Sequence, residues 1–199
     1  MFWKKETKAE LSPLEITHTV LGDTSGIISP MSCETALKYP FLSHYGANTE
    51  CDYCVNGTIG ELSFEFSYPL KVYSTERSKK YHHYSFIGNC LTIRHPGITL
   101  KKTYSFSGKP FCPPSDDLWV KGSKFKGVSI FSFGTELSDS ELNTVKCLIA
   151  WIESGLSAIL SARYAIFTNA GTANIVFWEP ELYDLESQLM ILKEKMLQY

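Results

Sequence analysis

The sequence predicts an α+β fold, in which one antiparallel, strongly twisted sheet of about six to eight strands carries helices on one face. An amphipathic helix begins near Asp139, and two runs rich in aromatic and β-branched residues follow it, at 163–168 and 173–178. Earlier in the chain, apolar and polar residues alternate as they do in half-buried strands. We expect one long amphipathic helix and a C-terminal helix to pack on the same face of this sheet.

The long helix has the clearest start. Ser138 as N-cap and Glu141 three residues later form a capping box, in which each residue binds an N–H group of the other. Its apolar stripe runs through Leu142, Val145, Ile149, Ile152 and Leu156. The pattern is compatible with an end at Gly155 or near Ser161. Asn169-Ala170-Gly171-Thr172 predicts the turn between the two strands that follow.

The first half of the chain predicts a strand at 16–21 and a short helix at 32–42. Asn56-Gly57 predicts a hairpin turn, because these residues best tolerate the positive φ angles of a type I′ turn. The strand behind this turn alternates from Leu62 onwards and is predicted to end at Pro69.

The middle of the chain predicts further strands separated by loops. The apolar pattern of residues 84–93 changes phase near Gly88, as a β-bulge would cause, and residues 98–106 alternate again. A proline-rich loop follows, and residues 118–120 and 128–133 predict two more strands.

Length and composition indicate a single domain at 13–199, preceded by a frayed arm at 1–12. The chain has 199 residues, of which 44% are hydrophobic, enough for one sizeable core. The formal charge of −2 disfavours nucleic acid as a partner. No stretch has the apolar length of a membrane span or signal core, so we expect a cytoplasmic protein without membrane insertion. Six cysteines are too few for a disulfide scaffold at this length.

The C-terminal segment after Pro180 predicts a helix with a narrow apolar seam. The apolar side chains of this seam are too costly to leave in contact with water, so we expect them to be buried. We favour docking on the chain's own sheet or helix, and a homodimer is the alternative. The seam residues are Leu182, Leu185, Leu189, Leu192 and Met196.

The order of these features resembles a bacterial family of uncharacterised domains, a domain of unknown function, over residues 26–178. The resemblance is carried by residues 55–60 leading into Phe64-Glu65-Phe66, by the basic loop before residues 84–88, and by the terminal helix with its strand pair. Members of that family often carry transmembrane helices ahead of this domain, and this sequence has none. The resemblance implies no catalytic residues.

Cys51 and Cys54 have the C-x-x-C spacing of redox and zinc sites. Because no second C-x-x-C occurs, a structural zinc ion would also need a distant ligand such as His44. We therefore predict no cofactor, with zinc as the alternative.

A second candidate is the basic and aromatic segment 77–84, which would suit phosphate groups or single-stranded bases. A solvated loop is the interpretation we favour. Its candidate ligand-binding residues are Arg77, Lys79, Lys80, His82 and His83.

None of the G-x-S-x-G, H-E-x-x-H, P-loop and G-x-G-x-x-G motifs occurs, and no catalytic residue is predicted. The sequence favours a non-enzymatic intracellular binding or regulatory module with a protein partner. One alternative is an enzyme or a metal or redox protein that uses Cys51, Cys54 and His44. The other is a phosphate or nucleic-acid binder through residues 77–84.

Overall fold

A computed structural model of the chain describes residues 12–21, 27–28, 48–59, 61–73, 84–98, 100–109, 111, 113–114, 117–157, 161, 163–178 and 185–197. The helix predicted at 32–42 lies outside these residues. So do residues 1–11 of the predicted N-terminal arm.

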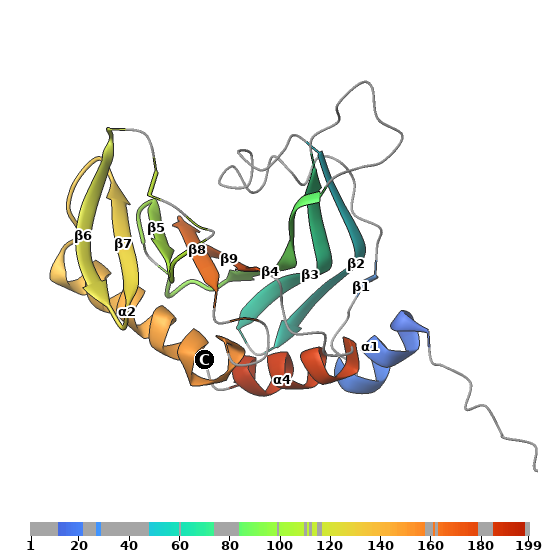
Figure 1. The fold of residues 1–199 in the computed structure, drawn as a ribbon. Coiled ribbons are helices and arrows are strands. Elements are labelled where there is room, and N and C mark those ends of the chain that lie inside the picture. Colours follow the sequence, from blue (N-terminus) through green and yellow to red (C-terminus); the bar gives the residue numbers. More distant parts are fainter. Residues whose placement is uncertain are drawn as a thin grey trace, which may run out of the picture.

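One antiparallel sheet dominates the fold (Figure 1). Its strands are β1 (Ile27–Ile28), β2 (Asn48–Ile59), β3 (Leu62–Tyr73), β4 (Tyr84–Arg94), β5 (Thr103–Phe106), β6 (Trp119–Phe125), β7 (Val128–Phe133), β8 (Tyr164–Asn169) and β9 (Thr172–Trp178). They lie in the order β1-β2-β3-β4-β9-β8-β5-β7-β6. The β8–β9 hairpin, predicted correctly, is therefore inserted between β4 and β5 and joins the two halves of the sheet.

The predicted α+β class is wrong, because the sheet dominates the fold. The helices pack on this sheet. The sequence predicted β2, β3 and β4 to be shorter than they are, and they contain 12, 12 and 11 residues. Gly57 and Pro69, residue types that favour the ends of strands, lie inside β2 and β3. The predicted single long helix is also interrupted, and a helix stands where the first strand was expected.

The hairpin turn predicted at Asn56-Gly57 is instead the interior of β2. The register of β2 with β3 shows no shift, and the chain reverses between Ile59 and Leu62. Gly57 lies opposite the buried Phe64, and a Cβ atom on Gly57 would lie 2.7 Å from Phe64 Cε1. Glycine is needed here because the phenylalanine ring fills the space of a side chain, rather than because the backbone requires positive φ.

Strand β3 continues past Pro69, where the sequence predicted its end. Its register with β4 shifts between Ser67 and Leu70, which pair with Cys90 and Gly88 respectively. Two residues of β3 thus face one residue of β4, and this irregularity accommodates a proline that has no N–H group to donate. The irregularity expected near Gly88 is confirmed, with the extra residue in β3.

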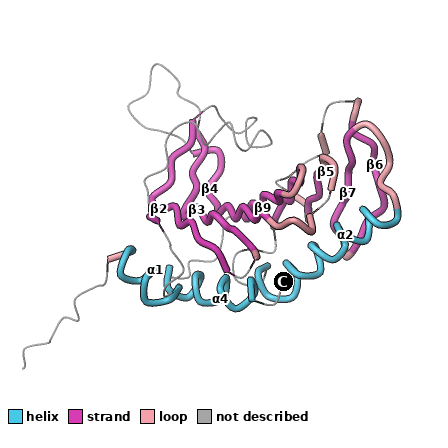
Figure 2. The backbone as a smooth tube through the Cα atoms, turned by 180° about the vertical axis from the view of Figure 1, so that it is seen from behind, coloured by secondary structure: helices cyan, strands magenta, loops and turns pink. Residues whose placement is uncertain are grey.

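The helices lie in a row along one side of the sheet, as Figures 1 and 2 show. They are α1 (Pro13–Leu21), α2 (Asp139–Trp151), the π-helical turn η3 (Ile152–Leu156) and α4 (Leu185–Leu197). Helices α1 and α4 are joined by a hydrogen bond that Lys193 Nζ donates to the Val20 carbonyl, at 2.8 Å. Among the described residues, no helix is long and apolar enough to cross a membrane.

Helix α1 occupies the place of the strand predicted at 16–21. Ser12 donates from its backbone N–H and its hydroxyl to Glu15 Oε2, at 2.7 and 2.6 Å, and its Oγ accepts from Glu15 N at 3.4 Å. Pro13 follows at the first helical position, where its missing N–H costs nothing. The start signal is therefore a capping box of the same S-x-x-E pattern as Ser138 and Glu141.

Helix α2 begins as predicted, with the capping box of Ser138 and Glu141 formed. It then passes into η3, where Gly155 leaves helical geometry at φ 172 and ψ −37. Lys195 of α4 lies against Gly155, and Trp151 Nε1 donates to the Lys195 carbonyl at 2.9 Å. The helix is thus interrupted where α4 packs against it.

Four seam residues of the C-terminal helix, all within α4, are buried inside the chain; they are Leu185, Leu189, Leu192 and Met196. Leu182 lies outside the described residues. The four share one core with the helix-facing residues of the sheet and with the apolar face of α2. In this structure they pack inside the chain, as the favoured alternative predicts, and the homodimer stays a prediction.

Candidate ligand-binding site

The sheet face opposite the helices carries a second apolar cluster, which we call the aromatic cluster. It contains Cys90, Tyr104, Phe106, Phe111, Phe131, Ala165, Phe167 and Val176, with Trp119 and Trp178 packed against it. Phe131 faces away from its neighbour Ile130, which belongs to the core on the helix side. The rings of Phe106 and Phe131 are nearly parallel, with 9° between their planes and centroids 5.9 Å apart.

A cavity of about 580 Å³ lies beside this cluster, and we call it the basic pocket. Its lining residues are Phe106, Ser107, Gly108, Lys109, Phe111, Pro113, Lys124, Gly127 and Ser129. They come from the end of β5, from the loop that follows it and from the β6–β7 hairpin. Cavities of this size hold small-molecule ligands in other proteins.

On one side of the pocket, strand pairing brings the lining residues together. Phe106 pairs with Ser129 of β7, and Ser129 pairs with Lys124 of β6, so the three residues share one face. The hairpin turn beyond them contains Lys126 and Gly127 with φ angles of 47° and 82°. Positive φ at both positions is the geometry of a tight hairpin turn, which fixes the position of Lys124 on the rim.

The loop after β5 is held to the neighbouring strand by Ser107. The Ser107 hydroxyl donates to the Tyr164 carbonyl at 3.2 Å and accepts from Tyr164 N at 2.9 Å. The Tyr164 hydroxyl in turn donates to Glu153 at 2.6 Å. Burial, followed by this contact with a carboxylate, raises the pKa of Tyr164 far above its usual range. The pocket wall is thus tied to η3 on the other face of the sheet.

The two lysines of the pocket carry charge that no described residue neutralises. Lys109 and Lys124 are exposed, and within the described residues neither forms an ion pair or a hydrogen bond. None of the described residues that line the pocket is acidic. Two uncompensated ammonium groups beside an apolar wall produce a local positive potential that favours an anion.

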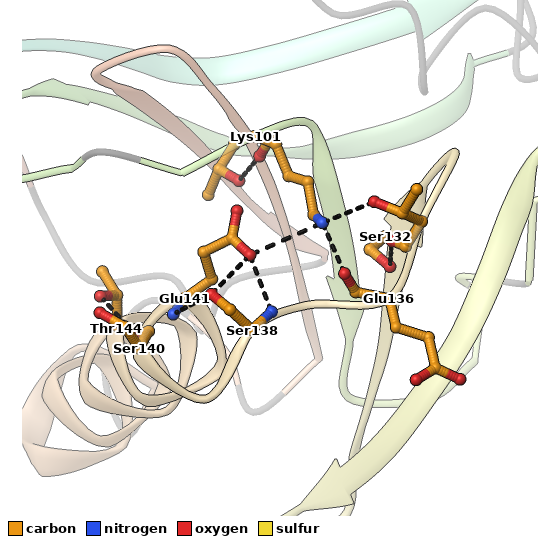
Figure 3. A network of polar contacts seen from close by, with 9 residues as sticks. Lys101, Ser132, Glu136, Ser138, Ser140, Glu141 and Thr144 are labelled. Carbon is orange, nitrogen blue, oxygen red and sulfur yellow. Dashed lines mark hydrogen bonds and ion pairs between the residues drawn. The ribbon is translucent and has the colours of Figure 1, made fainter.

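Two nearby lysines are engaged within the chain. Figure 3 shows that Lys101 points into the start of α2, where Nζ donates to Thr135 Oγ1 at 2.9 Å and to the Glu136 carbonyl at 2.6 Å. It also lies 3.6 Å from the Glu141 carboxylate. Lys102 Nζ lies over the rings of Phe133 and Trp119, at 4.3 and 5.4 Å from their centroids. These contacts distinguish them from Lys109 and Lys124.

The described lining of the basic pocket has polar groups that suit the binding of an anion. Among the described residues that line it there is no carboxylate, imidazole or thiol. Its polar groups are two ammonium groups, the serine hydroxyls and backbone N–H groups. Such a set can bind and orient an anion.

Six of the site residues predicted from the sequence cannot be compared with the basic pocket. Arg77, Lys79, Lys80, His82, His83 and His44 lie outside the described residues. Cys54 is buried in β2, where its Sγ accepts from the Ser67 hydroxyl at 3.9 Å and from Asn56 Nδ2 at 3.8 Å.

Positions 51 and 54 differ by three, an odd number, in a strand whose register does not shift. Positions on one face of a strand are separated by even numbers, so the spacing does not place this pair on a common face. In the described part of the chain, no group of three or more His, Cys, Asp and Glu residues is placed to hold a metal ion. The zinc alternative stays a prediction.

The sequence did contain a signal for the basic pocket, although it was dispersed. Residues 101–126 include six lysines and two aspartates, whereas the whole chain has a formal charge of −2. Lys121, Lys124 and Lys126 lie within six residues, but the loop after β5 separates them in sequence from Lys109, so no local window shows that Lys109 and Lys124 share a site. Only strand pairing brings Lys124 beside the end of β5.

Known proteins provide no guide to the ligand. Comparisons with protein-family models, with curated proteins and with solved structures find no match for this chain. The resemblance to an uncharacterised bacterial family therefore stays a prediction, and the case for the site rests on its own geometry.

Proposed function

We propose that the chain is a non-enzymatic binding module whose basic pocket takes up an anionic ligand. The observation that carries this proposal is the pair of exposed lysines, Lys109 and Lys124, which have no ion-pair partner and no acidic neighbour in the lining among the residues that the structure describes. Free ammonium groups retain their full attraction for a ligand, because no intramolecular partner has to be displaced. A phosphate or carboxylate group would supply the missing charge.

We further propose that the module acts in a reducing compartment such as the cytoplasm. Cys54, Cys90 and Cys147 are free thiols, two of them buried. Thiols persist where glutathione and thioredoxin keep them reduced. The protein partner expected from the sequence stays a separate prediction.

The proposal is tested by calorimetric titration with sulfate, pyrophosphate, citrate and ADP at low ionic strength. We expect at least one of these anions to bind with a stoichiometry near one. Affinity should fall as sodium chloride is added, because about 0.1 M salt screens charges beyond roughly 10 Å. Lys109→Gln combined with Lys124→Gln should abolish binding.

Lys121→Gln is the matched control. Lys121 is also exposed and also lies on β6, but it lines a different cavity of about 280 Å³, between β6 and the start of α2. Its substitution removes the same charge and should leave binding intact. Failure of all four anions to bind, or an equal loss in the Lys121→Gln variant, would overturn the proposal.

A further inference from the structure

The wall of the basic pocket beneath the lysines is aromatic. Phe106 and Phe111 line the cavity and are buried, with 8% and 3% of their surfaces exposed. Pro113, an exposed residue, lines it as well. An inorganic anion held by the lysines would have no contact to make with this apolar wall.

The ring of Phe106 is fixed in position by its neighbours. It is stacked on Phe131, and its centroid lies 5.4 Å from that of Tyr104. A planar ring that enters the pocket would meet a surface that is already ordered, so little side-chain entropy is lost on binding. Aromatic side chains that line a pocket favour contact with a planar apolar ring over contact with a hydrated anion.

The glycines of the pocket leave room beside the lysines. A Cβ atom on Gly108 or on Gly127 would have no other atom within 4 Å. Both residues have positive φ, at 139° and 82°. Both glycine positions are thus open to a side-chain atom, and the volume of about 580 Å³ exceeds what a simple anion requires.

From this geometry we infer that the ligand is an anion joined to a planar ring, of the nucleoside phosphate class. The ring lies against Phe106 and Phe111, and the phosphate groups lie between Lys109 and Lys124. This inference rests on the proposed function, since it names the ligand class of the same pocket. It adds a requirement for the ring, which the lysines alone do not impose.

The test compares ADP, pyrophosphate and adenosine by calorimetry at one ionic strength. ADP should bind about tenfold more tightly than pyrophosphate, the gain expected for one stacked base, and adenosine should bind more weakly than ADP. Phe111→Leu should reduce the affinity for ADP several-fold and leave pyrophosphate binding unchanged. Thermal unfolding of this conservative variant establishes that it is folded.

Each result of this comparison is decisive. Pyrophosphate binding as tight as ADP binding overturns the ring requirement and leaves the anion site standing. The comparison of ADP with pyrophosphate on the unaltered chain decides this even if Phe111→Leu does not fold. Failure of ADP and of every other anion to bind removes the proposed function itself, so the two failures are distinguishable.

Discussion

At two glycines, the effect of adding a side chain depends on which residue the new side chain would meet. Gly57 faces the buried ring of Phe64, which is held in the core. Gly155 faces the end of the Lys195 side chain, which can swing aside. Its φ of 172° is extended backbone that any residue adopts. We expect the first glycine to be essential and the second to be replaceable.

Gly57→Ala should therefore destabilise the fold by about 1–3 kcal/mol, the usual cost of overpacking a core. Gly155→Ala, the matched control, should cost well below that. The measurement is the free energy of unfolding in urea. Phe64→Leu should be less harmful in the Gly57→Ala background than in the parent chain, because the smaller side chain relieves the contact. Strict additivity of the two substitutions would show that they do not compete for the same space.

Lys102 is predicted to stabilise the β5–β7 region through its charge. Its ammonium lies near the rings of Trp119, Phe133 and Phe167. Lys102→Met keeps the apolar stem and removes the charge, so it should cost about 1 kcal/mol, within the usual range for cation–π contacts. Lys102→Arg should cost less. Urea unfolding monitored by tryptophan fluorescence measures both, and equal losses in the two variants would argue that charge has no role.

Among the elements, the capping box of α2 should make stability depend on pH. Hydrogen bonds from the Ser138 backbone and hydroxyl, together with Lys101, lower the pKa of Glu141 from 4.5. A lowered pKa in the folded state contributes stability above the unfolded value, and this contribution is lost as the pH falls through the folded value. Glu141→Gln should thus lose less stability than the parent chain between about pH 6 and pH 3.

Chemical unfolding at these two pH values provides the measurement, and Glu136→Gln serves as the control. Glu136 is exposed, and its part in this network is through its backbone carbonyl. It should therefore follow the parent chain. In the same cap, Ser138→Ala should cost about 1 kcal/mol at neutral pH. A parent-like pH response of Glu141→Gln would contradict the role assigned to this carboxylate.

For helices and strands, the sequence predicts features that depend on neighbouring residues well and features that depend on tertiary contacts poorly. The α2 cap and the β8–β9 hairpin are fixed by residues close in sequence, and both were predicted correctly. The cap of α1 was equally local, in Ser12 and Glu15, but the short apolar run behind it suits a strand as well as a helix. The role of Gly57 depends on Phe64 across the sheet, and the position of Lys124 depends on pairing with β7. Neither can be read from a local window.

For the whole molecule, α4 is predicted to be indispensable. Each buried seam residue contributes roughly 1.5–3 kcal/mol, and four of them lie in the shared core. Removal of residues 180–199 should give a chain that unfolds or aggregates at every concentration. Circular dichroism and light scattering would show this. A truncated chain that stays folded and monomeric would mean that α4 covers no essential surface.

The place of the β8–β9 hairpin in the sheet sets the order in which the molecule can be completed. Strand β4 pairs with β9 and strand β5 pairs with β8, yet both hairpin strands follow in the sequence all the others of the sheet. While the chain is being synthesised, β4 and β5 lack these neighbours until residues 164–178 have left the ribosome. Two unprotected strand edges are sites of intermolecular pairing. We expect a ribosome-bound chain that stops before Tyr164 to require chaperones, whereas the full-length chain closes its own sheet.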